Sequence, residues 1–277
     1  MMLARFFKML FAHQQIRPHF YGIHKKIIKP FGWFKTSTIV HSLPNGIKME
    51  LHLSDWIQQN LYFLNVYEAF EIAFIYKSLK PGGVFIDVGT NVGWHSLNAS
   101  KAVGKDGLVI CFEPFTLNWN RLNKNISLNP EMTNIHAEKL GVGAESGTIT
   151  LNYNFESNNA GMASQFGSGG QYEEVQVVAL DMYIKQAEID KIDLIKIDIE
   201  GGEYNALLGM EDVLRSFKPI LMVEFDSEIL KDQADIEGKM YAFLHELGYK
   251  PTYFNSKGEL CDNSLESHSK NIIFWNI

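Results

Sequence analysis

One segment constrains this chain more than any other: an apolar run with a carboxylate passes directly into a glycine-framed turn. The run covers residues 84–88 and contains Asp87, and the turn covers residues 89–93. A helical pattern follows from 92 to about 103. A strand that ends in an acid and turns tightly into a helix is typical of a nucleotide-type cofactor site.

The spacing of the glycines narrows the choice of ligand. The dinucleotide fingerprint G-x-G-x-x-G, started at Gly89, needs glycine where this chain has Asn91 and Trp94. The Lys-Ser/Thr pair of a phosphate loop is also missing from the segment. What remains suits a ligand with a ribose and a charged amino-acid tail, and S-adenosylmethionine has both.

Strand and helix patterns alternate from 84 to 226, which predicts a doubly wound, mostly parallel α/β sheet. The strands read as continuous apolar runs, as in sheets buried on both faces. Strands are expected at 47–53, 84–88, 108–112, 135–140, 193–197, 220–223, 250–254 and 272–277, the last two as an antiparallel pair.

Several other elements are expected around this sheet. Asp55 should cap one helix from 56 to 79, and one helix should carry the apolar residues from Leu207 to Phe217. Two extra strands, 148–153 and 174–180, should pair with each other. The polar segment 154–170 between them is expected to be a loop, either a lid over the site or a connection without a role.

Four acidic residues mark the ends of the clearest parallel strands: Asp87, Glu113, Asp198 and Glu224. Ligands of such sheets bind beyond the carboxyl ends of the strands. A core strand has no structural use for a terminal carboxylate, and burying one without a partner costs free energy. We therefore expect the four side chains to face one cleft.

Each residue near the turn has an expected role. Glu113 lies twenty residues after Gly93, the offset at which an acid accepts ribose hydroxyls, although a solvent-facing glutamate is the alternative. Gly89 and Gly93 would let the backbone approach the ligand closely. Asn91 would hold the turn or bind the methionine carboxylate, and Asp87 would receive the methionine ammonium directly or through water.

A second dense segment, 196–203, combines one lysine with several acids. By strand alternation Lys196, Asp198 and Glu200 should face one way and form an ion-pair network around a substrate hydroxyl. Oxygen ligands from Asp198, Glu200 and Glu224 would also suit magnesium. No histidine joins this set and Lys196 competes for the charge, so we assign no metal.

His95 is the best-placed histidine, directly after the glycine turn. Imidazole titrates near neutral pH, which suits a general base, although a helix side chain bonded to backbone is the alternative. The sequence has no Gly-x-Ser-x-Gly elbow and no Cys-x-x-Cys pair, so triad and zinc chemistry have no support.

Charge is unevenly distributed along the chain. The net charge is −7, yet residues 1–49 carry eight Lys/Arg and no Asp or Glu, which leaves 17 basic and 32 acidic residues, or −15, in the rest. So acidic a body argues against a nucleic-acid enzyme. Residues 1–35 interleave basic and aromatic residues, which suits an anionic membrane surface; packing on the chain's own domain or on a partner is the alternative.

Cysteine content and apolar runs bear on the compartment. Cys111 and Cys261 are too few for a disulfide framework, and Cys111 should be a buried small hydrophobe. No apolar run reaches the ~18 residues of a membrane helix, and Lys8 interrupts any signal-peptide core. We expect a cytoplasmic protein, with the inner membrane surface as an alternative.

Residues 87–93, 112–114, Asn125 and 193–203, in this order, resemble the FkbM-type family of S-adenosylmethionine-dependent methyltransferases. The resemblance covers about residues 65–277 and includes Tyr67-Glu68 and Gly248-Tyr249; Thr90 stands where alanine is usual. It implies the class I methyltransferase fold, a Rossmann-like seven-stranded sheet with an antiparallel last strand. It also implies O-methyl transfer, often to a sugar or polyketide hydroxyl.

The sequence thus predicts a methyltransferase domain at 47–277 behind a basic aromatic arm at 1–46. The expected acceptor is a hydroxyl of a sugar, glycolipid or natural product, with Asp198, Glu200 and Lys196 beside it and Asp198 or His95 as base. Asp198 is also counted among the cofactor residues. N-methylation, an oxidoreductase and a non-catalytic interaction protein remain alternatives, and the oligomeric state stays open.

Overall fold

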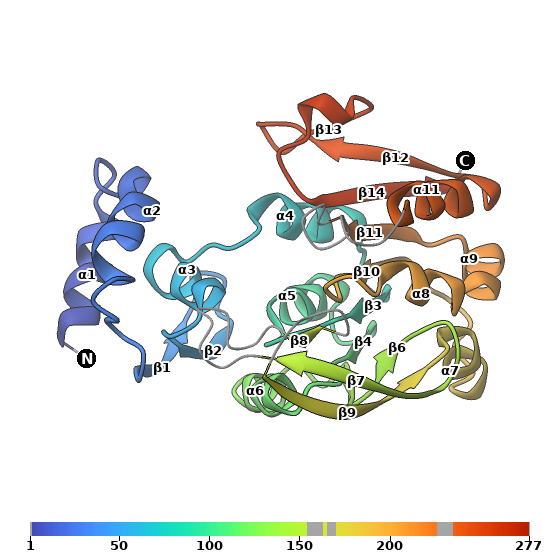
Figure 1. The fold of residues 1–277 in the computed structure, drawn as a ribbon, viewed down its shortest axis with the longest axis horizontal. Helices are drawn as coiled ribbons and strands as arrows, with labels where there is room; N and C mark the ends of the chain where they lie inside the picture. The colour runs from blue at the N-terminus through green and yellow to red at the C-terminus, as the bar shows by residue number, and fades with distance from the viewer. Residues whose placement is uncertain (1, 154–162, 165–169, 226–234, 277) are drawn as a thin grey trace.

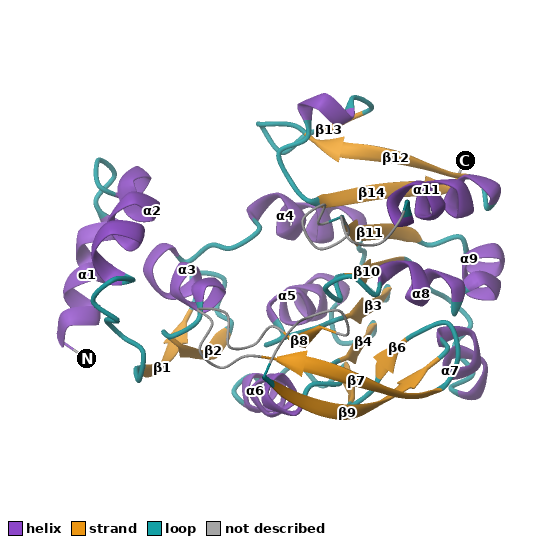
Figure 2. Ribbon diagram, in the orientation of Figure 1, coloured by secondary structure: helices purple, strands orange, loops and turns teal. Residues whose placement is uncertain are grey.

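The large sheet has eight strands in the order β13-β12-β14-β11-β10-β3-β4-β5. It is seen in a computed structural model that describes residues 2–153, 163–164, 170–225 and 235–276 (Figures 1 and 2). The strands are β3 (Val84–Val88), β4 (Leu108–Phe112), β5 (Ile135–Glu138), β10 (Leu194–Ile197), β11 (Ile220–Glu224), β12 (Tyr249–Phe254), β13 (Leu260–Cys261) and β14 (Asn271–Asn276).

The strand directions confirm the predicted sheet. The central strands β5, β4, β3, β10 and β11 run parallel. The last strand, β14, lies antiparallel between β11 and β12. The two-residue β13 adds an eighth strand at the edge. The expected α/β fold with an antiparallel last strand is therefore what the chain adopts.

Helices cover both faces of this sheet (Figure 2). They are α4 (Ala69–Ser78), α5 (Trp94–Val103) and α6 (Thr116–Ser127) with one face, and α7 (Leu180–Gln186), α8 (Glu203–Leu208), α9 (Glu211–Phe217) and α11 (Ile236–Glu246) with the other. Successive strand residues alternate between the two cores: Phe85 and Cys111 pack with the first set, and Ile86 and Ile110 with the second. Burial on both faces explains the unbroken apolar strands.

A small sheet in the order β6-β9-β7-β8 stands beside the large one. Its strands are β6 (Gly141–Val142), β7 (Gly147–Tyr153), β8 (Ala163–Ser164) and β9 (Gln171–Val178). β7 and β9 pair antiparallel along their length, so the predicted pairing of the two extra strands is confirmed. Apart from β8 and Gly170, the expected lid segment lies outside the described residues.

The N-terminal segment folds as a cap at one end of the molecule (Figure 1). Its elements are α1 (Met2–Ala12), η1 (Arg17–His19), α2 (Phe20–Ile23), η2 (His24–Ile28), the hairpin β1 (Thr38–Ser42) and β2 (Lys48–His52), and α3 (Trp56–Leu64). Ala4, Phe7 and Phe11 of α1 are buried in one cluster with Phe63 and Trp94. One face of the basic aromatic arm thus packs on the chain's own body.

The prediction of a single helix at 56–79 is wrong. Asp55 does cap the start of α3, as expected, by accepting a hydrogen bond from the Gln58 backbone N–H at 3.0 Å. The chain breaks between α3 and α4, because Asn65 and Glu68 take left-handed φ values of 56° and 47°. Asparagine tolerates this conformation, whereas a glutamate there is uncommon.

The single helix expected from Leu207 to Phe217 is also two helices, α8 and α9. They meet at Gly209, where an added Cβ would overlap the carbonyl oxygen of Gly143. Other features agree with expectation: Cys111 is fully buried, and both cysteines are free thiols. No helix in the described part of the chain is both long and apolar enough to cross a bilayer.

Two buried asparagines, Asn125 in α6 and Asn129 just after it, attach the N-terminal hairpin to the large domain. The Asn125 amide accepts a hydrogen bond from the Glu50 backbone N–H at 2.8 Å and donates one to the Val92 carbonyl at 2.8 Å. Asn129 bonds both backbone groups of Lys48. Asn125 therefore links β2 directly to the glycine turn.

We expect Asn125→Ala to lower the free energy of unfolding by about 2–4 kcal/mol, because it leaves a buried N–H and a buried carbonyl without partners. Urea denaturation measures the loss. Asn123→Ala, an exposed change on the same helix, is the control and should cost less than about 0.5 kcal/mol. Equal losses in the two variants would contradict the structural role of Asn125.

Candidate cofactor and catalytic site

The turn after β3 depends on its two glycines. Gly89 and Gly93 have φ values of 85° and 92°, which side chains rarely adopt. A Cβ on Gly89 would overlap the carbonyl oxygen of Asp198, and one on Gly93 would lie 2.8 Å from the Leu122 side chain. The end of β3 and the end of β10 are therefore in direct backbone contact.

Asp87 lies beneath this turn, as the penultimate residue of β3, and only 1% of it is exposed. One carboxylate oxygen accepts a short hydrogen bond from the Ser96 hydroxyl. The other, Oδ1, is buried and has no hydrogen-bond partner among the described residues. A buried acceptor without a partner favours a donor that a ligand would supply.

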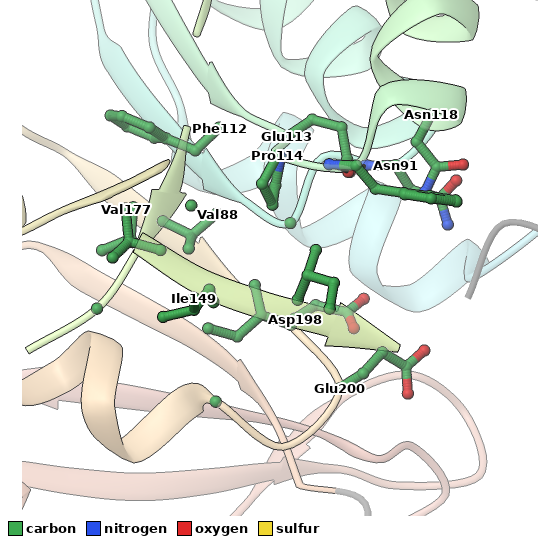
Figure 3. A pocket seen from close by; sticks show the side chains of 18 of the residues that line it. Val88, Asn91, Phe112, Glu113, Pro114, Asn118, Ile149, Val177, Asp198 and Glu200 are labelled. Carbon is green, nitrogen blue, oxygen red and sulfur yellow. Dashed lines mark hydrogen bonds between the residues drawn. The ribbon is translucent and has the colours of Figure 1, made fainter. Parts of the chain in front are cut away.

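A cavity of about 430 Å³ opens beside the turn, at the carboxyl ends of β3, β4, β10 and β11. This volume lies in the range of small-molecule sites. In Figure 3, Asn91 and Glu113 lie on one side of the cavity, and Asp198 and Glu200 on the other. Ile149 and Val177 of the small sheet add an apolar wall.

Glu113 is held by two backbone amides. Its carboxylate accepts hydrogen bonds from the N–H groups of Asn91 at 2.7 Å and Phe115 at 3.0 Å. Burial raises the pKa of Glu113 to about 8, and the nearby carboxylates of Asp87 and Asp198 act in the same direction. Each carboxylate oxygen keeps acceptor capacity for a ligand hydroxyl.

Lys196 and Asp198 form a buried ion pair at the end of β10. The Lys196 ammonium lies 2.7 Å from Asp198 Oδ2 and has 1% of its side chain exposed, whereas 24% of the Asp198 side chain is open. Burial alone would lower the pKa of Lys196, but Asp198, Asp87 and Glu68 outweigh it and raise that pKa. The lysine is firmly charged.

Asp198 and Glu224 share the next interaction. Burial would raise the pKa of Asp198, yet Lys196 and a hydrogen bond from Glu224 lower it. Burial and the charge of Asp198 raise the pKa of Glu224 to about 10. At neutral pH Glu224 is thus a carboxylic acid that donates a hydrogen bond, and Asp198 is an ionised acceptor.

Glu200 lines the cavity from a turn rather than from a strand. Strand β10 ends at Ile197, so the expected alternation does not reach Glu200, which has a left-handed φ of 57°. The buried Glu203 carboxylate secures this turn by accepting hydrogen bonds from the N–H groups of Ile199 at 3.0 Å and Gly201 at 3.1 Å.

Two residues that sequence reasoning left without a role stand near the site: Tyr67, which lines the cavity, and Glu68. The Glu68 carboxylate lies 2.9 Å from His95 Nε2. Burial would raise the pKa of Glu68, but His95 and Lys196 outweigh it and lower that pKa. The only sequence signal was that Tyr67-Glu68 belongs to the family resemblance.

The structure brings most predicted residues to one place. Glu224 and five of the proposed site residues line the cavity, namely Gly89, Asn91, Glu113, Asp198 and Glu200. The other four, Asp87, Gly93, Lys196 and His95, lie behind the wall, with Asp87 and Lys196 coupled electrostatically to it. Within the described ranges, no group of three or more acidic, histidine or cysteine side chains is arranged to hold a metal ion.

The raised pKa of Glu113 predicts a pH dependence of stability. The fold favours the protonated carboxyl, so this stabilisation is complete below the ordinary pKa of 4.5 and is lost as the pH rises toward 8. Glu113→Gln cannot ionise. Its stability relative to wild type should therefore increase by about 2–4 kcal/mol between pH 5 and pH 8.

Urea unfolding at the two pH values measures this difference. Glu131→Gln, an exposed change, is the control and should show no pH-dependent gain. A constant difference between wild type and Glu113→Gln across the range would mean that Glu113 ionises freely in the folded protein.

Comparison with known proteins agrees with this geometry. Methyltransferase sdnD of Sordaria araneosa is 24% identical over 184 residues, which cover 51% of this chain and 70% of that protein. Hexuronic acid methyltransferase AglP of Haloferax volcanii is 25% identical over 152 residues, which cover 54% of this chain and 59% of that protein. The chain thus matches little more than half the length of AglP.

Solved structures with a similar arrangement include methyltransferase FkbM from Methylobacillus flagellatus. It is 17% identical, covers 80% of this chain and 55% of that chain, and gives a TM-score of 0.47. The O-methyltransferase from Bacillus cereus in complex with SAH is 13% identical, covers 76% and 80% of the two chains, and gives 0.46.

The family comparison covers the site itself. The model of the methyltransferase FkbM domain matches residues 87–251, more than half of the chain. The match begins at Asp87 and includes Glu113, Asp198 and Glu224. The sheet order, the glycine turn and this match agree: the chain belongs to the FkbM methyltransferase family.

Proposed function

We propose that this protein transfers the methyl group of S-adenosylmethionine to a hydroxyl oxygen of a sugar, glycolipid or natural-product acceptor. One observation carries the proposal: a single cavity joins the glycine turn and Glu113 on one side to Asp198 and Glu200 on the other. The similarity to a hexuronic acid methyltransferase supports a sugar as the acceptor.

The residues around the turn fit the cofactor. Gly89 leaves room that a Cβ would fill. The unpartnered Asp87 Oδ1 suits the methionine ammonium, directly or through water, and Glu113 suits the ribose hydroxyls. Asn91 would hold the turn or bind the methionine carboxylate. Such a set provides acceptors for the ammonium group and the ribose hydroxyls of the ligand.

The protein's part in catalysis would be to position the acceptor. When bound, S-adenosylmethionine supplies an electrophilic methyl group, so the side chains need only orient the attacking oxygen and take its proton. Asp198 is ionised, open to the cavity and fixed by Lys196, which suits it to accept a hydrogen bond from the hydroxyl. Glu200 places a second carboxylate on that side.

Asp198 can act as base despite its lowered pKa. A hydroxyl that gains a bond to carbon becomes strongly acidic, so a weakly basic carboxylate suffices to accept its proton. His95 as base stays a prediction. Because it does not line the cavity and contacts Glu68, its position favours holding the 67–68 turn.

Glu113→Ala should weaken the binding of S-adenosylmethionine by about 10–100-fold, because two hydrogen bonds to the ribose hydroxyls would be lost. Titration calorimetry measures the change. Glu138→Ala is a matched control: Glu138 ends the neighbouring strand β5 but bonds Tyr183, outside the cavity. Binding of NADH with no binding of S-adenosylmethionine would refute the cofactor assignment.

Asp198→Asn should reduce turnover at least ~100-fold while cofactor affinity changes only a few-fold, because the amide keeps the shape but loses the base. Release of S-adenosylhomocysteine is the readout, with hexuronic acid glycosides, neutral glycosides and hydroxylated natural products as acceptors. Asp190→Asn, exposed ahead of the same strand, is the control. Turnover near wild type in Asp198→Asn would exclude its role.

A further inference from the structure

Helix α1 is apolar on two opposite faces. Ala4, Phe7 and Phe11 are buried against the protein. Met2, Phe6 and Met9 occupy positions i, i+4 and i+7 on the other side of the helix, with 89%, 54% and 69% of each residue exposed. The packing of the arm explains only the first of these faces.

The segment after α1 also carries exposed apolar side chains. Tyr21, Ile27 and Phe31 are also exposed. The exposed cations of the same two segments are Arg5, Lys25, Lys26, Lys29 and Lys35. We call these eleven residues of segments 2–9 and 21–35, six apolar and five basic, the outer face of the arm. Among the described residues, none of the five cations forms an ion pair with a carboxylate.

The other two cations of the arm bond to groups of the protein itself. The Lys8 ammonium donates a hydrogen bond to the Tyr62 carbonyl at 2.7 Å and lies 2.8 Å from His41 Nε2, and burial lowers its pKa to about 8. Arg17 donates to the Leu64 carbonyl at 2.8 Å. Two cations therefore attach the arm to α3, whereas the five on the outer face are not needed for its packing.

We propose that the outer face of the arm docks on an anionic lipid bilayer. The bulky apolar side chains would enter the interface between headgroups and acyl chains, while the lysines and Arg5 would lie among the lipid phosphates. Residues 1–49 contain no acid, whereas the rest of the chain carries −15. An anionic surface attracts the arm and repels the body, which sets one orientation of the molecule.

A second copy of this chain is a weaker occupant of the same face. A symmetric dimer would place the same five cations opposite each other, and like charges across an interface oppose association. The bilayer also fits the position of the arm, which stands at one end of the molecule with α3 and the hairpin behind it (Figure 1). Ile57 of α3 lines the cavity and Leu61 packs in the arm's cluster, so docking would hold the cavity near the lipid surface.

Co-sedimentation of the full chain with lipid vesicles tests the proposal. We expect binding to vesicles of phosphatidylcholine with phosphatidylglycerol, little binding to phosphatidylcholine alone, and release by salt. Lys25→Gln, Lys26→Gln and Lys29→Gln combined should weaken binding on the order of 100-fold, at about fivefold per lysine. Met2→Ser, Phe6→Ser and Met9→Ser combined should abolish it.

Matched changes elsewhere serve as controls. Lys239→Gln, Lys250→Gln and Lys257→Gln combined remove three exposed lysines outside the arm, and Leu265→Ser removes an apolar side chain that is 93% exposed. Both should bind vesicles as wild type does, and thermal unfolding should show every variant folded.

Three results would overturn the proposal. The first is equal binding of wild type to neutral and anionic vesicles, or to neither. The second is equal weakening by the arm variants and their matched controls. The third is self-association of wild type without lipid that the Met2, Phe6 and Met9 changes abolish, because a second copy would then be the occupant. These measurements need no methyl acceptor, so they stand apart from the proposed activity.

Discussion

The buried ammonium of Lys196 is the interaction on which the site depends. It lies within the influence of three carboxylates from different parts of the chain: Asp198 after β10, Asp87 in β3 and Glu68 at the start of α4. Without a cation, these acids would repel one another in a region with little water. The lysine thus allows acidic side chains to gather at the carboxyl edge of the sheet, where a ligand with donor groups needs acceptors.

The parallel sheet could be predicted because its strands are buried on both faces and read as short apolar runs between turn residues. The acids at the strand ends could be predicted for a related reason: a carboxylate next to a buried run has few structural uses. Glu113 and Asp198 line one cavity as expected, and the charge of Asp87 acts on Glu113 from behind its wall.

Other features depend on contacts that no local pattern records. The break between α3 and α4 places Glu68 in a left-handed conformation that a glutamate rarely adopts. The helical pattern of apolar residues continues across Glu68, so the sequence does not indicate the break. The contact between Glu68 and His95 joins the residue before α4 to α5 and follows from that break. Helix α1 was not predicted. The arm's mixture of basic and aromatic residues indicates that it packs or docks, but it does not indicate which face of the helix packs on the protein.

The close approach of Gly89 to the Asp198 carbonyl has a consequence for the variety of acceptors that such a site can serve. Here the backbone after β3 contacts the backbone after β10. The distance between the glycine turn and Asp198 is therefore set by the sheet and not by side chains that evolution can exchange. Another wall of the cavity is different. Ile149, Leu151 and Val177 come from the small sheet, and their size and shape do not depend on the contact between Gly89 and Asp198. Substitutions in that wall can therefore change which acceptor fits, while the distance between the glycine turn and Asp198 stays the same.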